Sequence, residues 1–381
     1  MNFNCIVVGA GLAGITAART VQQAGNSVLL LEASDQVGGR VRSDVIDGFI
    51  CDRGFQVINP KYPQVVKSKV IKELDFKYIS GKIRLADEQL KVGYSLSTFS
   101  PKLGSINQKL RFLKFVASPK VKNEKSFGHY TTEFPDLYQK VLKPFLSGVF
   151  LTDPQEIASD VAQEILRSFV KSLPGVPAAG VGEFSRALAK PIQNLKLNES
   201  VQAVSNGQVT TNQGSYRGRY VIVATDPTTA AQLLSGVQLP KMLSSTTAYF
   251  ATNQLPSDAN NLVVSNKSKL VNSIVISQVS SKYAPIGQHL ISATCLTAIT
   301  ESVFRKELAE IWQTNTHSWE YVARYEIKQS LPAHLPGVSK TKIAKFSDQI
   351  YLAGDHMAVP SQQGAMQSGF LAARAINQLI Q

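Results

Sequence analysis

Residues 4–42, NCIVVGAGLAGITAARTVQQAGNSVLLLEASDQVGGRVR, contain the parts of a nucleotide site within one β-α-β unit. Residues 5–8 are a short, largely β-branched run, which is typical of a buried parallel strand. A G-x-G-x-x-G pattern follows at residues 9–14, and apolar residues then recur at helical spacing up to Gly25. The stretch therefore has the order of strand, turn and helix that this glycine motif requires.

The three glycines of the motif have different physical roles. Gly9 permits a tight turn, Gly11 lets the backbone approach a pyrophosphate, and Gly14 lets the helix lie close to the strand. The N-terminus of the following helix offers free N–H groups and a partial positive charge to phosphates. The predicted phosphate-binding positions are Gly9, Ala10, Gly11, Leu12, Ala13 and Gly14.

A second predicted strand, residues 27–31, ends at an acid. Glu32 stands 18 positions after Gly14, close to the spacing of the acid that accepts the ribose hydroxyls, and Ala33 follows it. An acid at this place repels a 2′-phosphate. The ligand is therefore predicted to be FAD or NAD and not NADP.

The continuation of this stretch favours FAD. Gly38 and Gly39 bring backbone back toward the same diphosphate, and Arg40, followed by Val41, adds a guanidinium that can form paired charge-assisted hydrogen bonds.

Three segments together carry a family resemblance: GAGLAG at residues 9–14, LEASDQVGGRVRS at 31–43 and YLAGDHMAVPSQQGAMQSGFLAARAI at 351–376. They resemble the flavin-containing amine oxidase superfamily, which includes plant-type phytoene desaturases and protoporphyrinogen oxidase. The resemblance covers residues 4–62 and 348–380 and is weaker between them. Gln36 departs from the R-x-G-G-R pattern of the family, which leaves Arg40 as the predicted phosphate partner.

The resemblance implies further cofactor contacts. A glycine turn at Gly54, Phe55 and Gln56 would run beside the isoalloxazine ring, although an ordinary β-turn stabilised by Asp52 also fits that segment. A C-terminal helix would point its N-terminus at the N1–C2=O edge of the flavin, although a plain core helix explains its apolar stripe. The other positions implied are Val201 and Ala224 near the adenosine, Gly354 and Asp355 near the ribityl chain, and Gly364, Ala365 and Met366 at the helix start.

The resemblance also implies the fold class, which is an α/β, Rossmann-type FAD-binding domain with an interleaved α+β substrate domain of mixed sheet and helices. The predicted FAD-binding segments are 1–63, 190–228 and 346–381, and the predicted substrate-binding segments are 64–189 and 229–345. Gly180 and Gly182 lack a third glycine and a preceding strand, so no second dinucleotide domain is predicted.

Hydrophobic patterns predict the individual elements. The predicted helices are 65–74, 106–115, 132–142, 157–169 and 301–314, and the predicted strands are 195–204, 208–211, 220–224, 269–277, 289–295 and 349–355. A Ser-Asn-Gly turn at residues 205–207 predicts a hairpin between the first two of these strands.

The formal net charge of +13 raises the question of an anionic partner. No nucleic-acid motif is present, so nucleic acid is not predicted. Residues 61–143 contain 17 Lys or Arg against 7 Asp or Glu, and this basic region is either a membrane-docking face or a solvated lysine-rich surface.

Other sequence features bear on compartment and metals. No secretory signal precedes the first strand, no apolar run reaches a membrane span, and three scattered cysteines suggest reduced thiols. A cytoplasmic protein is predicted, either free or peripherally attached to a membrane. The histidines at 289, 317 and 334 are unclustered, so no metal site is predicted.

The predicted chemistry is hydride removal from a substrate C–H bond onto flavin N5, with two electrons passed to oxygen, a quinone or another acceptor. Amine oxidases usually place an aromatic residue where Ser361 stands, and they often attach FAD through a nearby cysteine, whereas no cysteine follows Cys295. FAD is therefore predicted to bind noncovalently, and an apolar substrate of isoprenoid, carotenoid or tetrapyrrole kind is favoured. The alternatives are an amine or amino-acid oxidase and a non-catalytic FAD-binding or electron-relay protein. Gln56 and Arg53 are the weak catalytic candidates.

Overall fold

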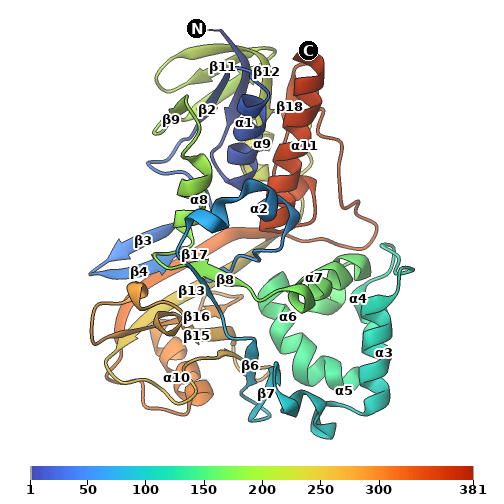
Figure 1. The fold of residues 1–381 in the computed structure, drawn as a ribbon, viewed down its shortest axis with the longest axis vertical. Coiled ribbons are helices and arrows are strands. Elements are labelled where there is room, and N and C mark those ends of the chain that lie inside the picture. The colour runs from blue at the N-terminus through green and yellow to red at the C-terminus, as the bar shows by residue number, and fades with distance from the viewer. Residues whose placement is uncertain (1, 381) are drawn as a thin grey trace.

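The computed structural model describes residues 2–380 and joins both ends of the chain in one β-sheet (Figure 1). At its centre β1 (Asn2–Val8) lies in parallel between β2 (Val28–Leu31) and β12 (Ser215–Val223). β18 (Ile350–Leu352) pairs in parallel with the carboxyl-terminal half of β12. All four residues of β2 are buried, which explains why these strands are continuous apolar runs.

The edges of this sheet are formed by residues near 200. β9 (Leu195–Lys196) extends the sheet in parallel beyond β2. On the other side β10 (Val201–Ser205) and β11 (Gln208–Thr211) form an antiparallel hairpin that pairs with the start of β12. The sheet is therefore parallel at its centre and mixed at one edge.

Helices cover both faces of this sheet. Alternate residues of β1, such as Cys5 and Val7, pack in one cluster with α1 (Leu12–Gln23) and α11 (Gln362–Ile380). The intervening residues pack in a second cluster with α9 (Pro227–Leu233). A buried strand thus uses its two-residue period to fill two cores at once.

α1 and α11 lie side by side in Figure 1 and approach closely. A Cβ added at Gly369 of α11 would lie 2.0 Å from the Ala13 carbonyl oxygen, so this helix contact needs a glycine. α8 (Gly182–Ala189) packs nearby, since Arg19 of α1 donates to the Leu188 carbonyl oxygen at 3.0 Å. The predicted domain division at residue 190 would place α8 in the substrate-binding segment, and α8 contacts α1 of the predicted FAD-binding segment.

A second seven-stranded sheet lies below the first one in Figure 1. All of its neighbouring strands are antiparallel except β14 and β6. α10 (Glu301–Trp312) packs against it, and the Trp312 indole N–H donates to Ser273 Oγ at 2.9 Å. In spatial order its strands are β17 (Glu320–Pro332), β13 (Met242–Thr252), β16 (His289–Cys295), β15 (Leu270–Val275), β14 (Leu262–Val264), β6 (Lys82–Leu85) and β7 (Leu90–Gly93).

A helical part stands beside this second sheet and has a core rich in aromatic residues. Its helices are α3 (Ile106–Ala117), α4 (Phe127–Thr131), α5 (Pro135–Leu137), the π-helical turn η4 (Tyr138–Leu142), α6 (Lys143–Phe150) and α7 (Ser159–Lys171). The connecting elements are β3 (Ser43–Ile46), β4 (Phe49–Asp52), α2 (Pro63–Ser68), β5 (Phe76–Tyr78) and β8 (Gly175–Pro177). The short 3-10 helices are η1 (Val70–Glu73), η2 (Leu96–Phe99), η3 (Pro101–Leu103), η5 (Pro154–Glu156), η6 (Ile276–Gln278), η7 (Ser281–Tyr283) and η8 (Asp355–Met357).

The predicted fold class is confirmed, as are the helices expected at 106–115, 157–169 and 301–314 and the strand expected at 289–295. The hairpin turn at residues 205–207 is also confirmed.

Four predicted elements are wrong in extent. The strand expected over 349–355 spans only Ile350–Leu352, and Asp355 begins the 3-10 helix η8. The strand expected over 195–204 is two strands, because Asn198 has a φ of 55° and turns the chain between them. The helix expected over 65–74 ends at Ser68, because Lys69 has a φ of 61°. The helix expected over 132–142 breaks before Pro135, which lacks an N–H for a continuing helix.

Membrane-spanning helices and clustered metal ligands are both absent from residues 2–380. No helix in that range is long and apolar enough to cross a bilayer, and no group of three potential metal-ligating side chains lies together. Cys5, Cys51 and Cys295 are free and buried, and burial raises the pKa of the Cys51 thiol to about 12.

Candidate functional site

The carboxyl ends of β1, β12 and β18 meet at one edge of the first sheet, because the three strands are parallel neighbours. Gly9 leaves β1 with a φ of 94°, and a Cβ added there would lie 3.0 Å from the Ala224 carbonyl oxygen. Its N–H donates to the Leu31 carbonyl oxygen at 2.8 Å. The first glycine turn is therefore held between the ends of β12 and β2, which is where open α/β sheets bind nucleotides.

Two glycine turns face one another at this edge. Gly38 donates its N–H to the Ala10 carbonyl oxygen at 2.7 Å, and a Cβ added at Gly39 would lie 3.3 Å from the Gly11 Cα. A Cβ added at Gly11 would have no described neighbour within 4 Å, whereas one at Gly14 would lie 1.8 Å from the Gly9 carbonyl oxygen. Gly14 is thus required by packing, and Gly11 leaves open space before the helix.

The start of α1 remains available to an anion. No described side chain caps this helix at Gly11, and no acidic residue occupies its first turn. The first N–H groups of a helix otherwise need a capping side chain, water or a ligand. An uncapped N-terminus beside two glycine turns is suited to a diphosphate.

Glu32 is fixed against the first glycine turn. Its Oε2 accepts the Ala10 N–H at 2.7 Å, and its Oε1 accepts the N–H and the hydroxyl of Ser34 at 3.0 and 2.7 Å. The backbone N–H of Glu199 donates to the Glu32 carbonyl oxygen at 2.8 Å, which brings the start of β10 at Val201 to the same side. The predicted ribose-binding acid and the predicted adenosine-side strand are therefore neighbours, and Ala33 lies exposed beside them.

Arg40 forms a two-pronged ion pair with Asp355. Nη1 and Nη2 of Arg40 each lie 2.8 Å from one carboxylate oxygen, and Nη1 also donates to the Ser330 carbonyl oxygen at 2.7 Å. Burial lowers the pKa of Arg40, but the Asp355 carboxylate outweighs this effect and the net pKa is raised. The Arg40 guanidinium thus stays charged at the sheet edge.

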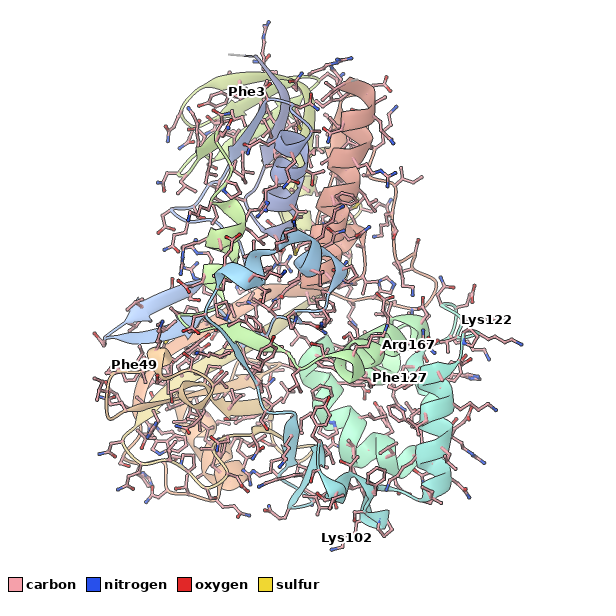
Figure 2. All side chains as sticks on the ribbon, viewed as in Figure 1. Phe3, Phe49, Lys102, Lys122, Phe127 and Arg167 are labelled. Atoms are coloured by element: carbon pink, nitrogen blue, oxygen red, sulfur yellow. The ribbon has the colours of Figure 1, made fainter. Side chains whose placement is uncertain are left out.

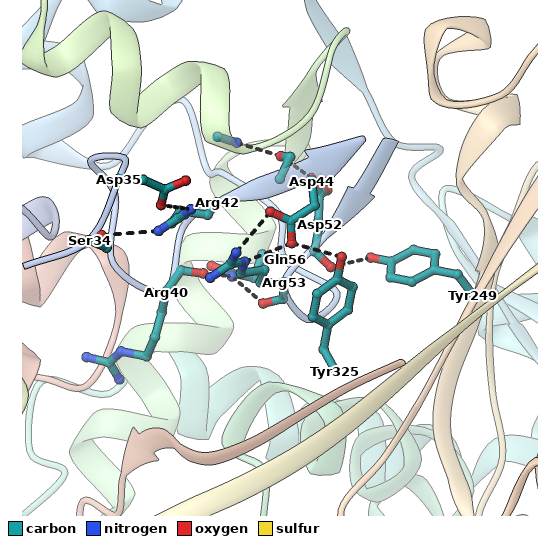
Figure 3. Close-up of polar contacts among 12 residues, drawn as sticks. Ser34, Asp35, Arg40, Arg42, Asp44, Asp52, Arg53, Gln56, Tyr249 and Tyr325 are labelled. Carbon is teal, nitrogen blue, oxygen red and sulfur yellow. Dashed lines mark hydrogen bonds and ion pairs between the residues drawn. The ribbon is translucent and has the colours of Figure 1, made fainter. Parts of the chain in front are cut away.

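The turn at residues 54–56 lies between this edge and the second sheet. Gln56 donates to the Arg40 carbonyl oxygen at 2.7 Å (Figure 3). It also accepts from Gln362 of α11 at 3.4 Å. Phe55 donates its N–H to Thr247 Oγ1 of β13 at 3.4 Å, and a Cβ added at Gly54 would lie 3.3 Å from Ile327 of β17. The turn therefore contacts both parts of the molecule.

The guanidinium of Arg53 is bound by the β3–β4 hairpin. Its guanidinium binds both carboxylate oxygens of Asp44 at 2.8 and 3.0 Å, and the Tyr325 hydroxyl donates to the same carboxylate at 2.9 Å (Figure 3). Burial raises the pKa of Asp44, but these hydrogen bonds outweigh burial and the net pKa is lowered. Of the two catalytic candidates, only Gln56 contacts Arg40.

Asp52 is a buried acid that joins several segments. It accepts from Ser43 Oγ at 2.6 Å, the Tyr283 hydroxyl at 2.8 Å and the Val181 N–H at 3.0 Å. Tyr249 of β13 donates to its backbone carbonyl oxygen at 2.8 Å. Burial raises the pKa of Asp52 to about 6 despite these donors. Asp52 therefore joins β3, the start of α8, η7 and β13, and does not only stabilise the turn that follows it.

The start of α11 is closely packed against the last strand. Ser361 Oγ accepts the Gly364 N–H at 3.0 Å, and a Cβ added at Gly364 would lie 1.8 Å from the Val359 carbonyl oxygen. The Gly354 N–H donates to Ser368 of α11 at 2.8 Å. Ala365 packs on the core cluster that includes the buried Met366 and Val41. Ser361 thus has a structural role in capping this helix.

Comparison with known proteins identifies the family of this chain. The family described as flavin containing amine oxidoreductase matches residues 12–377. The chain belongs to this family. Its members are flavin-dependent oxidoreductases, which agrees with the predicted enzyme class and with FAD as the cofactor.

Two sequence relatives show how far this similarity extends. The L-amino acid dehydrogenase of Synechocystis sp. is 24 % identical over 288 residues, 63 % of this chain and 59 % of that protein. The putrescine oxidase of Kocuria rosea is 48 % identical over 61 residues, 16 % of this chain and 13 % of that protein. The chain thus spans less than two thirds of the length of either relative.

Two solved structures share the fold over nearly their whole length. An oxidoreductase from Methanosarcina mazei has a TM-score of 0.80 at 16 % identity, covering 98 % of this chain and 100 % of that chain. A protein described as a protoporphyrinogen oxidase from Exiguobacterium sp. 255-15 has a TM-score of 0.73 at 17 % identity, covering 99 % of each chain. At these identities the similarity concerns the fold alone.

The residues at the sheet edge fit a flavin dinucleotide. The open space at Gly11, the uncapped start of α1 and the guanidinium of Arg40 provide donors for a diphosphate. Gln362 Oε1 of α11 is buried without a hydrogen-bond partner beside Gln56, so a polar group remains to be satisfied there. These donors and this unpartnered acceptor fit the polar groups of FAD.

The sequence-based site omitted His356. Its imidazole is buried, and neither Nδ1 nor Nε2 has a hydrogen-bond partner among the described residues. Burial lowers its pKa, and the neighbouring Asp355 opposes this effect only in part, so the ring is neutral at physiological pH. The available signal was its position directly after Asp355 in the last motif. An unpartnered neutral imidazole can donate to, or accept from, a bound polar molecule.

Proposed function

We propose that this protein is an FAD-dependent oxidoreductase that oxidises a C–H bond of an apolar substrate of isoprenoid, carotenoid or tetrapyrrole kind. FAD, when bound, supplies the two-electron oxidation, and oxygen, a quinone or another acceptor takes the electrons on. The cofactor would be held noncovalently by the two glycine turns, Glu32, Arg40, His356 and the start of α11. The chain's own contribution is to bind, orient and exclude water.

The observation that carries the substrate proposal is that the carboxylates near the 54–56 turn already have protein partners. Asp44 is paired with Arg53, Asp52 with the Ser43 and Tyr283 hydroxyls, and Asp355 with Arg40. A cationic amine buried at this junction would need an unpaired carboxylate or an aromatic cage. Ser361 has no aromatic ring to contribute to such a cage, and its hydroxyl already accepts the Gly364 N–H of α11.

A positioning role follows for Gln56. Its amide is held by the Arg40 carbonyl oxygen on one side and by Gln362 on the other. It therefore presents a fixed polar group at the junction of the two sheets without carrying a charge. Such a group can orient a substrate but is not suited to remove a proton from it.

The second candidate is an amine or amino-acid oxidase, because the Kocuria relative is named as a putrescine oxidase and the Synechocystis relative as an L-amino acid dehydrogenase. Anaerobic mixing of the FAD-loaded protein with phytoene in lipid vesicles, protoporphyrinogen, putrescine or L-leucine distinguishes the candidates by flavin bleaching. Bleaching by phytoene or protoporphyrinogen supports the proposal. Bleaching only by putrescine or L-leucine would reject it in favour of the second candidate, and bleaching by none of them would favour a non-catalytic FAD-binding or electron-relay protein.

A further inference from the structure

Helix α3 presents an apolar stripe to solvent. Ile106, Leu110 and Leu113 are 65 %, 56 % and 59 % exposed, and their spacing places them on one face of the helix. Phe112 and Phe115 point the other way and pack in the aromatic core of the helical part. A surface helix needs one apolar face to pack on its protein. α3 has two, and it lies at the outer edge of the molecule (Figure 1).

A neighbouring segment adds further exposed apolar side chains. Leu96 and Phe99 of η2 are 90 % and 72 % exposed. The Lys109 ammonium of α3 donates to the Ser100 carbonyl oxygen at 2.8 Å, so the end of η2 lies against the first half of α3. Gathered exposed apolar residues of this kind mark an interaction site more often than scattered ones do.

The charge along the segment that carries this stripe is of one sign, and the acid Asp136 of α5 accepts from Gln108 of α3 at 2.7 Å. Residues 89–123 contain seven Lys or Arg and no Asp or Glu. At 100° per residue, Arg111 and Lys114 lie on one side of the stripe and Lys109 on the other. Lys102 and Lys122 lie beyond the two ends of α3 (Figure 2). An apolar stripe bordered by cations is the pattern of helices that lie in a membrane interface.

We propose that α3 and η2 together form a docking surface for membranes that contain anionic phospholipids. The apolar side chains enter the boundary between headgroups and acyl chains, and the flanking Lys and Arg side chains contact lipid phosphates. This surface belongs to the helical part and includes none of the residues at the cofactor edge. The proposal therefore goes beyond the proposed function and does not depend on it.

Charge decides between this occupant and two others. A second copy of the chain would bring two surfaces of the same strong positive charge together, which is unfavourable. A nucleic acid would satisfy the cations but would leave Ile106, Leu110 and Leu113 in water. Only an anionic lipid surface complements both the charge and the apolar stripe.

Vesicle flotation of the full chain tests the proposal. We expect binding to vesicles of equal parts phosphatidylcholine and phosphatidylglycerol, little binding to phosphatidylcholine alone, and weakening by salt. Both the apolar variant L110Q/L113Q and the charge variant R111Q/K114Q should lower the partition coefficient about tenfold or more. The matched control L239Q/I286Q replaces exposed apolar residues outside α3 and should bind as the unchanged protein does.

Circular dichroism spectra and thermal midpoints establish that all variants are folded, which is expected because the replaced side chains are exposed. Equal partition of all variants, or equal binding to neutral vesicles, would overturn the proposal. So would DNA binding that is lost in R111Q/K114Q and kept in L110Q/L113Q while no vesicle binding occurs. A dimer that dissociates in L110Q/L113Q and binds no vesicles would assign the face to a second copy instead.

Discussion

Arg40 and Asp355 stand 315 positions apart in the sequence and form an ion pair with two contacts of 2.8 Å. Arg40 follows the second glycine turn, which is bonded to the first one, and Asp355 follows the strand β18 beside β12. The pair therefore ties the N-terminal and C-terminal motifs together at the edge where a nucleotide would bind. Either motif alone leaves this site incomplete.

Removing either charge of this pair should weaken FAD binding. We expect Arg40→Gln and Asp355→Asn each to raise the Kd for FAD about tenfold or more, because a hydrogen bond to a charged group contributes about 1.5–3 kcal/mol. The double variant should lose less FAD-binding free energy than the two single variants lose together, since the two residues are in contact. Fluorescence titration of apoprotein measures each Kd, and Arg111→Gln serves as a distant control. Unchanged affinity in both single variants would contradict a cofactor role for the pair.

Gly11, which caps α1, and Gly14, which lies within α1, should respond differently to a methyl group. Gly11→Ala places a Cβ in open space, so the fold should persist while FAD binding falls. Gly14→Ala places a Cβ 1.8 Å from a backbone oxygen, and such overpacking should cost about 1–3 kcal/mol of stability.

Thermal unfolding and FAD titration of both glycine variants separate these effects. Gly214→Ala, whose added Cβ also meets open space, is the control and should change neither quantity. An unfolded Gly11→Ala variant, or one with full FAD affinity, would show that Gly11 is not a phosphate-side position.

His356→Phe should have effects of opposite sign on the apoprotein and on the complex. It removes two buried nitrogens without partners, so the apoprotein should gain about 1–3 kcal/mol of stability. It also removes the groups proposed to contact FAD, so FAD affinity should fall. Thermal unfolding without FAD and a binding titration measure the two changes.

The buried His334 offers a contrast, because its Nε2 is bonded to the Val338 carbonyl oxygen at 3.1 Å. His334→Phe should therefore destabilise the apoprotein and leave FAD affinity unchanged. A His356→Phe variant that keeps full FAD affinity would remove this residue from the cofactor site.

Asp52 should make folding stability depend on pH in the direction opposite to that of an ordinary salt-bridged acid. Its folded pKa, about 6, lies above the unfolded value of about 4, so its ionisation opposes folding. Its favourable contribution is complete below pH 4 and is lost as pH rises through 6. The loss is on the order of 3 kcal/mol, since one pKa unit is worth about 1.4 kcal/mol.

Chemical denaturation between pH 4 and pH 7.5 tests this dependence against Asp52→Asn, which cannot ionise. The stability of the unchanged protein minus that of Asp52→Asn should decrease across this range. A difference that stays constant or increases would show that the Asp52 carboxylate is stabilised as an anion in the folded protein.

The sequence by itself determined the N-terminal part of the cofactor edge, residues 4–42, because these residues are brought together by short connections along the chain. Residues 4–42 specify strand, turn, helix and strand, and parallel strands necessarily end at one edge of their sheet. Gly11, Glu32 and Arg40 could therefore be assigned to one edge without coordinates, whereas the position of Asp355 was implied by the family resemblance. The docking surface on α3 was visible only in part, because the basic residues of 61–143 can be counted in a sequence, whereas the exposure of the apolar stripe cannot.

Tertiary structure decided which partner each polar side chain takes. Arg53, a catalytic candidate by position, is bound by Asp44 of the adjacent strand, and Asp52 is bound by Tyr283 of η7. The long strand β17 was not predicted, because its exposed and buried residues follow no strict alternation that marks a strand. Hydrogen bonds and burial depend on residues hundreds of positions apart, and the amino-acid sequence acquires those contacts only when the sheets pack together.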